Sequence, residues 1–185
     1  MSGGRGFAAL GMILAASAPL ARPAPGQDAQ GGATTAPATP IASLAWLAGG
    51  VWTAVVSPSG GGETRIETRY QWSDNGAYLR FTTHFVSGKG TLRNYDGNFF
   101  WNPDQAALAM WYTDAKGHIT QGPVTVSGDT MAMTFRGTDF EGKDADLRAT
   151  VTRRTNDEYA WLLEEKQPGA WKPLLALTYR RAAGP

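Results

Sequence analysis

The amino-acid sequence predicts a closed, antiparallel up-and-down β-barrel of about ten strands, preceded by a short N-terminal helix. Three observations lead to this fold class. Apolar and polar residues alternate with a period of two from Val51 onward, and clusters of turn-forming residues interrupt the alternation at short intervals. The links between the alternating segments are also too short for the crossover of about a dozen residues that parallel strands require.

The first 40 residues differ from the rest, because 19 of the 20 aromatic residues follow them. Arg5, the apolar stretch from Phe7 to Leu20, and Ala16-Ser17-Ala18 are typical of an export signal, although Pro19 hinders cleavage directly after Ala18. The apolar stretch is shorter than the roughly 20 residues of a membrane-spanning anchor, which is the alternative.

The sequence therefore divides into three parts. Residues 1–21 are the predicted export signal, and residues 22–40, rich in Ala, Gly, Pro and Thr, are a predicted disordered linker. Residues 41–185 form the predicted barrel domain. We expect a periplasmic or secreted protein with no stable membrane insertion after signal cleavage.

The first elements of the domain follow from local patterns. Pro40 to Leu47 predicts a helix of about two turns that ends at Gly49-Gly50. Val51 to Ser57 is the first predicted strand, and residues 63–72 alternate between a charged face and a face with Ile, Thr, Tyr and Trp. Ser73-Asp74-Asn75-Gly76 is a tight turn into a strand around residues 79–85, which makes a hairpin.

Seven further strands follow the same reasoning, each bounded by turn residues such as Asn102-Pro103. They are Thr91 to Trp101, Ala106 to Thr113, His118 to Ser127, Thr130 to Gly137, Asp144 to Arg154, Glu158 to Lys166, and Trp171 to Arg181. An open sheet of ten such strands would expose two edges and a broad apolar face, and closure into a barrel removes both problems. A two-sheet sandwich is the alternative, but it usually needs a long crossing connection that the sequence lacks.

Composition excludes several classes of function. The absence of Cys excludes disulfides, thiol nucleophiles and thiolate metal sites. After residue 40 the chain holds 15 basic and 15 acidic residues, so no bulk charge favours a nucleic-acid partner or an anionic membrane.

The N-terminal Gly50-Val51-Trp52 and the C-terminal Arg180-Arg181 carry a family resemblance. With the preceding helix and the strand count, they resemble the Gly-x-Trp signature of calycins, the lipocalin-like barrels, and the chain looks like an uncharacterised bacterial family of that group. The resemblance implies structural roles for Trp52 and for Arg181 (or Arg180), whose planar guanidinium suits stacking on the indole at one end of the barrel. Some such barrels bind haem through a His near the C-terminal end. This chain has no His after His118, so we expect no cofactor.

Candidate catalytic groups are few. His84 and His118 are the only histidines, neither has a clear relay partner, and a metal site needs two to four converging ligands. Glu164 and Glu165 point to opposite faces of a strand, so they cannot share a site without a bulge. We therefore predict no metal site and no catalytic residue.

Large apolar side chains instead predict a ligand cavity, because a barrel of eight strands already holds one small ligand and the diameter grows with strand number. We expect an exported, non-catalytic barrel that binds a small apolar or amphipathic molecule. One alternative is a cavity enzyme, an isomerase or hydrolase using Arg80 or a buried carboxylate. Another is an envelope protein-interaction module with Trp101 and Trp171 as exposed anchors. The predicted ligand-binding residues are Tyr70, Trp72, Phe81, Phe85, Tyr112, Met133, Phe135 and Trp161.

Overall fold

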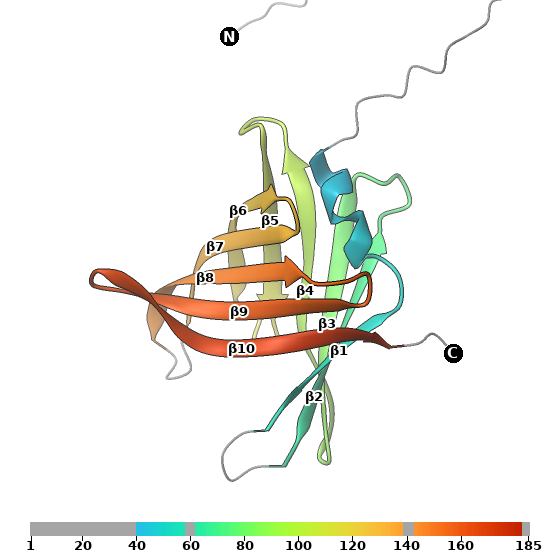
Figure 1. The fold of residues 1–185 in the computed structure, drawn as a ribbon, viewed down its shortest axis with the longest axis vertical. Coiled ribbons are helices and arrows are strands. Elements are labelled where there is room, and N and C mark those ends of the chain that lie inside the picture. Colours follow the sequence, from blue (N-terminus) through green and yellow to red (C-terminus); the bar gives the residue numbers. More distant parts are fainter. Residues whose placement is uncertain (1–39, 58–61, 139–142, 183–185) are drawn as a thin grey trace, which may run out of the picture. The chain divides into compact units, whose positions relative to one another are not determined.

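The computed structural model describes residues 40–57, 62–138 and 143–182. Within them, ten strands form one closed barrel in sequence order, and every neighbouring pair is antiparallel (Figure 1). The strands are β1 (Val51–Val56), β2 (Thr64–Trp72), β3 (Tyr78–Ser87), β4 (Gly90–Asn102), β5 (Ala107–Asp114), β6 (Ile119–Ser127), β7 (Thr130–Thr138), β8 (Asp144–Arg153), β9 (Glu158–Gln167) and β10 (Ala170–Ala182). The predicted fold class is confirmed, and the sandwich alternative is wrong because β1 pairs with β10.

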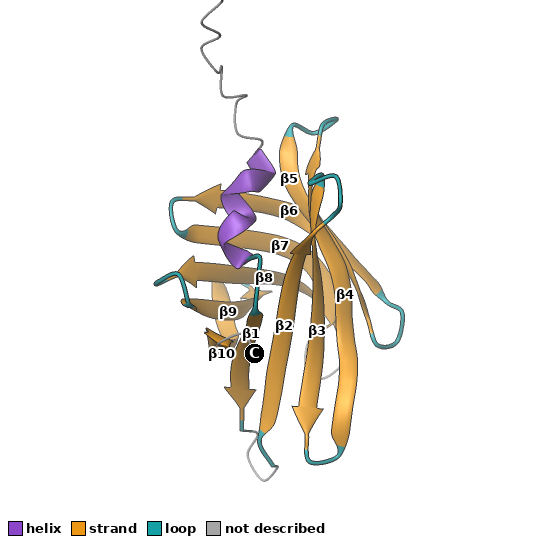
Figure 2. Ribbon diagram, turned by 90° about the vertical axis from the view of Figure 1, so that its right-hand side faces the viewer, coloured by secondary structure: helices purple, strands orange, loops and turns teal. Residues whose placement is uncertain are grey.

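The predicted N-terminal helix is a 3-10 helix, η1 (Pro40–Leu47), which precedes β1 (Figure 2). Its apolar residues Ile41, Leu44 and Leu47 are all buried in the core. Nowhere in the described residues is a helix long and apolar enough to cross a membrane. The predicted export signal and residues 22–39 of the predicted linker lie outside the described residues.

The barrel closes where β1 pairs with β10, and Trp52 lies directly opposite Arg181 at this seam. The Trp52 side chain is fully buried, and its indole Nε1 donates a hydrogen bond of 2.8 Å to the carbonyl of Leu47 at the end of η1. The Arg181 guanidinium lies over the indole, 4.4 Å from the ring centroid. This stacking places a planar cation and a large apolar ring at the end of the barrel where β1 begins.

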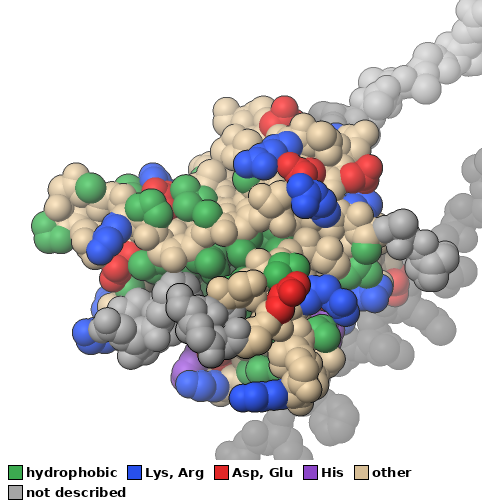
Figure 3. Space-filling model, turned by 60° about the horizontal axis from the view of Figure 1, so that its bottom comes forward, with side chains coloured by type: hydrophobic (Ala, Val, Ile, Leu, Met, Phe, Trp, Pro, Cys, Tyr) green, Lys and Arg blue, Asp and Glu red, His purple; other side chains and the backbone are tan. Residues whose placement is uncertain are grey.

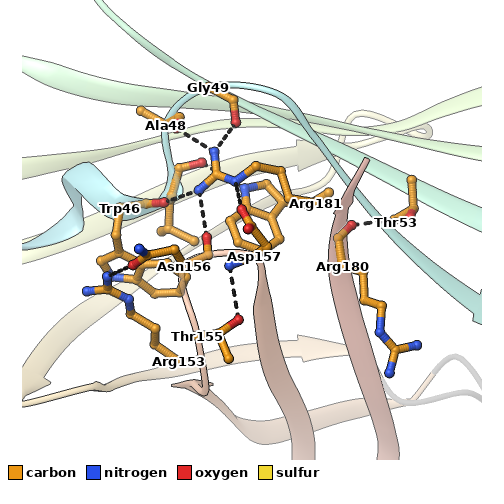
Figure 4. Close-up of polar contacts among 12 residues, drawn as sticks. Trp46, Ala48, Gly49, Thr53, Arg153, Thr155, Asn156, Asp157, Arg180 and Arg181 are labelled. Carbon is orange, nitrogen blue, oxygen red and sulfur yellow. Dashed lines mark hydrogen bonds and ion pairs between the residues drawn. The ribbon is translucent and has the colours of Figure 1, made fainter. Parts of the chain in front are cut away.

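The same guanidinium also binds the backbone of two further segments (Figure 4). It donates hydrogen bonds to the carbonyls of Trp46 at 2.7 Å, Ala48 at 2.9 Å and Asn156 at 3.1 Å, and to the carbonyl of Gly49. Trp46 to Gly49 belong to η1 and the link that follows it, whereas Asn156 lies in the turn between β8 and β9. One side chain of β10 therefore holds together the helix, the strand seam and a turn. We call Trp46, Trp52 and Arg181 the plug.

The backbone conformation at position 50 explains why the Gly-x-Trp pattern begins with glycine. Its φ of +71° lies in the left-handed region, which residues with a Cβ rarely adopt. A Cβ there would also lie 3.1 Å from Cγ of Arg181, closer than an ordinary contact. The glycine thus lets the chain turn from η1 into β1 directly beneath the arginine stem.

Truncation of the plug tryptophan is expected to destabilise the barrel strongly. Trp52→Ala removes a fully buried side chain, and such changes lower the free energy of unfolding by about 3 to 5 kcal/mol. Denaturant titration measures the change. Trp111→Ala, at a side chain that is 39% exposed on β5, is the matched control and should cost less than about 1 kcal/mol. Equal effects of the two substitutions would contradict the role assigned to Trp52.

Candidate functional site

The barrel encloses a cavity of about 580 Å³. Val56 and Thr64, at the adjoining ends of β1 and β2, contribute to its wall, whereas Trp52 at the other end of β1 does not. The cavity therefore begins beneath the plug and extends to the opposite end of the barrel. Figure 3, in which that end comes forward, shows hydrophobic side chains gathered in the central hollow.

Seven of the eight residues predicted as ligand-binding line this cavity: Tyr70, Phe81, Phe85, Tyr112, Met133, Phe135 and Trp161. Strand alternation was sufficient to place them, because each has the inward orientation that its position in the strand predicts. Whether they bind a ligand stays a prediction.

Trp72 is the exception, since it does not line the cavity. It has the same inward parity as Tyr70, but it lies further along β2 from Thr68, the residue that pairs with Trp52. The link after η1 crosses β2 there, and the backbone N–H of Gly49 donates a hydrogen bond to the carbonyl of Tyr70. Trp72 is half-buried against the hydrophobic core instead. Alternation along the strand predicted which face Trp72 occupies. It did not predict that η1 and the link after it occupy the interior at this point.

Several lining residues were not among the sequence candidates. The most informative are Thr68, Thr83, Tyr159 and Tyr179, whose hydroxyl groups lie near the plug end of the cavity. Alternation along β9 and β10 could have found the two tyrosines, because Tyr159 shares the face of Trp161, and Tyr179 that of Leu177. The threonines carry no such signal, because Thr on a strand also suits a solvent-exposed face.

The methionines outside the N-terminal region, Met110, Met131 and Met133, come together in the cavity wall. All three are buried. Met110 comes from β5, and Met131 and Met133 come from β7, which is separated from β5 by β6. Thioether side chains adapt their shape to whatever they contact, so this part of the wall can adjust to ligands of different outline. We call these three residues the methionine wall.

Gly97 makes room for aromatic rings inside the barrel. A Cβ at this buried position would lie 2.5 Å from Cβ of Tyr112 and 2.8 Å from Cζ of Phe81, distances that real Cβ atoms do not show. The two rings therefore pack across β4 at the glycine, with their centroids 6.2 Å apart. The aromatic side of the cavity depends on this missing side chain.

Hydroxyl groups near the plug form short hydrogen-bonded pairs. The hydroxyl oxygens of Thr68 and Thr83 lie 3.0 Å apart, and those of Tyr70 and Tyr159 lie 3.4 Å apart. Tyr159 also stacks on Tyr179 and contacts Trp52, with both ring centroids 4.8 Å away. The base of the cavity is thus a layer of tyrosine rings directly beneath the plug.

Burial keeps the cavity tyrosines neutral. It raises the pKa of Tyr70 to about 12, with the hydrogen bond to Tyr159 acting in the opposite direction. Burial also raises the pKa of Tyr112 to about 12, against a hydrogen bond with Thr120, and raises the pKa values of Tyr159 and Tyr179 still further. These phenols are therefore protonated at neutral pH.

No charged side chain lines the cavity among the described residues. Arg80, the candidate of the enzyme alternative, lies on the outer face and forms a two-bond ion pair with Asp96, at 2.9 and 3.1 Å. The buried carboxylate is Glu164, and it also lies outside the barrel, 2.7 Å from the guanidinium of Arg148. The charged groups that suggested catalysis thus form ion pairs outside the cavity.

The two histidines do not enter the cavity either. His84 lies on β3 opposite Glu67 of β2. His118 has a partner that the sequence analysis missed, since its Nδ1 lies 2.9 Å from a carboxylate oxygen of Asp114 across the turn between β5 and β6. That pair is on the surface, and the part of the chain that the structure describes holds no cluster of three or more His, Asp or Glu residues that could bind a metal ion.

The tryptophans proposed as exposed anchors are both half-buried, so that prediction is wrong. Trp101 packs against the core, and Trp171 lies beneath the guanidinium of Arg148, which is 4.6 Å from the ring centroid. Among the described residues, the large hydrophobic side chains that are exposed are Val55, Tyr78, Leu92, Trp111 and Ile119.

Comparison with known proteins supports the fold alone. No protein-family profile matches the chain, and no curated protein matches it. Among solved structures, the chain is similar to the crystal structure of Rv2717c from M. tuberculosis, with a TM-score of 0.52 and 16% sequence identity. The match covers 77% of this chain and 97% of that chain, so the similarity extends over the barrel.

The raised tyrosine pKa values predict a loss of stability in alkali. A phenol whose folded pKa lies above its ordinary value of 10.0 holds its proton more tightly in the folded state, so unfolding releases protons and stability falls as the pH rises from 10 toward 12. Each such tyrosine contributes up to about 1.4 kcal/mol per pH unit in this window.

Chemical denaturation at a series of pH values measures this loss. Tyr70→Phe removes one of the titrating groups and should give a shallower decline than the wild type, by up to about 1.4 kcal/mol per pH unit. Identical declines for the two proteins would show that the Tyr70 hydroxyl does not remain protonated in the folded barrel.

Proposed function

We propose that this protein is an exported, calycin-like barrel that binds one small apolar or amphipathic molecule and performs no chemistry on it. The observation that supports the proposal is the cavity of about 580 Å³ with its apolar and aromatic wall. Ligand sites typically enclose about 300 to 1,000 Å³, and they combine mostly hydrophobic walls with a few polar groups. This interior has both properties.

The apolar wall of this cavity favours the binding of molecules with a hydrocarbon chain. Each CH₂ group transferred from water to an apolar wall contributes roughly 0.8 kcal/mol, from which the loss of translational and side-chain freedom is subtracted. A chain of ten to twelve carbons gains about 8 to 10 kcal/mol before that subtraction, which leaves an affinity between about micromolar and millimolar.

The two alternatives draw less support from the described residues. An isomerase or hydrolase in this cavity would depend on neutral tyrosine and threonine hydroxyls, because Arg80 and Glu164 lie outside it. An interaction module needs a contiguous apolar surface, but the exposed Val55, Leu92 and Ile119 lie on different strands.

Export and membership of the calycin group are part of the same proposal. Gly50, Trp52 and Arg181 lie as the resemblance implies, with the guanidinium over the indole. Residues 1–21 carry the features of an export signal, so the mature protein should be periplasmic or secreted. Intact mass spectrometry of the exported protein should show a chain that lacks at least residues 1 to 18.

A binding experiment with a fluorescent apolar probe tests the proposal. The wild type should bind one probe per barrel with about micromolar affinity and change its intrinsic tryptophan fluorescence, because Trp161 lines the cavity. Ala149→Phe places a ring in the cavity wall, where Ala149 is 2% exposed, and should weaken binding at least about tenfold. Thr125→Phe, at an exposed position on β6, is the control and should bind as the wild type does.

Circular dichroism and denaturant titration verify that both variants are folded. If no probe from a chemically varied set bound to the wild type, the binding proposal would be wrong. Equal weakening by Ala149→Phe and Thr125→Phe would place the probe on the surface, which would also contradict it.

A further inference from the structure

Five of the hydroxyl-bearing residues that line the cavity are gathered at one side of its plug end, whereas Thr64, Tyr95 and Tyr112 lie elsewhere in the wall. Thr68 and Tyr70 come from β2, Thr83 from β3, Tyr159 from β9 and Tyr179 from β10, and the barrel order makes these strands near neighbours through β1. We call them the hydroxyl cluster. The methionine wall lies on β5 and β7, across the barrel. A molecule in this cavity therefore meets a cluster of five hydroxyl groups on one side and the three thioethers on the other.

Not every O–H donor of the hydroxyl cluster has an acceptor within the cluster. Each hydroxyl group carries one O–H donor. In the pair formed by Tyr70 and Tyr159, one O–H donates to the other oxygen, so the second O–H has no acceptor within the pair. Thr68, Thr83 and Tyr179 are linked in the same way, because Thr68 also hydrogen-bonds Tyr179, and three hydroxyls joined by two hydrogen bonds leave one O–H over. Both spare donors lie where a bound molecule could supply an oxygen.

Tyr70 is the most accessible member of the tyrosine pair, because it is half-buried whereas Tyr159 is 1% exposed. Tyr159 is fixed by its contacts with Trp46 and Trp52 of the plug, with ring centroids 5.7 and 4.8 Å away. Tyr159 thus holds the neighbouring hydroxyl of Tyr70 in a defined position, where a ligand can form a hydrogen bond with it. Binding then costs less entropy, because the donor is already ordered in the free protein.

The lining also limits the charge of the ligand. The described cavity wall contains no Lys, Arg or His side chain that could pair with an anion, and no carboxylate that could pair with a cation. Moving an unpaired charge from water into such an apolar site is strongly unfavourable. The tyrosine hydroxyls are neutral, so they can donate hydrogen bonds but supply no countercharge.

We propose that the cavity selects uncharged amphipathic molecules, whose carbonyl or ester oxygen accepts a hydrogen bond from the Tyr70–Tyr159 pair while the apolar body packs against the methionine wall. This inference rests on the proposed ligand-binding function and specifies its ligand class. It distinguishes the cavity from one built for free carboxylic acids, which would require a cation in the wall.

Three probes of equal chain length test the inference: methyl dodecanoate, dodecanoate and dodecane. Competition with the fluorescent probe measures their affinities. At pH 8 the ester should bind at least about tenfold more tightly than the ionised acid, which has no countercharge in the cavity. The affinity for the acid should rise as the pH falls and the carboxyl group is protonated.

A double variant tests the attachment point. Tyr70→Phe with Tyr159→Phe keeps both rings and removes both hydroxyls. It should lower the affinity for the ester about three- to tenfold, the usual effect of one hydrogen bond. Dodecane has no acceptor, so its affinity should change less than about twofold. Tyr78→Phe removes an exposed hydroxyl outside the cavity and is the control. Denaturant titration verifies that the double variant is folded.

The possible failures can be told apart. If ester and dodecane respond equally to the double variant, or if dodecanoate at pH 8 binds as tightly as the ester, the inference is wrong and the binding function stands. If none of the three probes competes and the fluorescent probe does not bind, the proposed function itself fails.

Discussion

The stacking of Arg181 on Trp52 is the interaction on which the rest of the structure depends. The two residues face each other across the seam between the first and last strands, so their contact forms only when the barrel is closed. The guanidinium also donates to carbonyl oxygens of η1, of the link after it and of the turn between β8 and β9. A planar group with five donors can serve several backbone acceptors at once while its face remains on the indole. The same side chain therefore joins the first and last strands and covers this end of the barrel.

The plug also determines where the cavity lies. Trp46 packs edge to face against Trp52 and Tyr159, whose rings are tilted relative to each other, and the three rings fill the interior at the end where β1 begins. Beyond Tyr159 no helix fills the described interior, and ten strands make a barrel wider than the eight that side chains alone just fill. A cavity is the consequence. Because the strands alternate, charged residues are directed to the outer face, and the interior receives apolar rings, methionines and hydroxyl groups.

Much of the fold could be predicted from the sequence, because period-two alternation and short turns are local signals that agree with each other along the whole domain. The same alternation identified seven cavity residues. It failed for Trp72, whose surroundings depend on where η1 crosses β2, which is a tertiary fact. It also could not show that Thr68 meets Thr83 or that Tyr70 meets Tyr159, since the members of the tyrosine pair are 89 residues apart in the chain. The pair Asp114 and His118 was missed because a turn, and not a strand, brings the two side chains together.

The most direct test of the account observes the cavity wall itself. Met110, Met131 and Met133 all line the cavity, so their methyl groups serve as reporters in an NMR spectrum of protein labelled at the methionine methyl carbon. Titration with methyl dodecanoate should shift the three cavity signals together and reach saturation at one molecule per barrel. Cavity signals that stay unchanged up to the solubility limit of the ester, in a protein shown to be folded, would contradict the account.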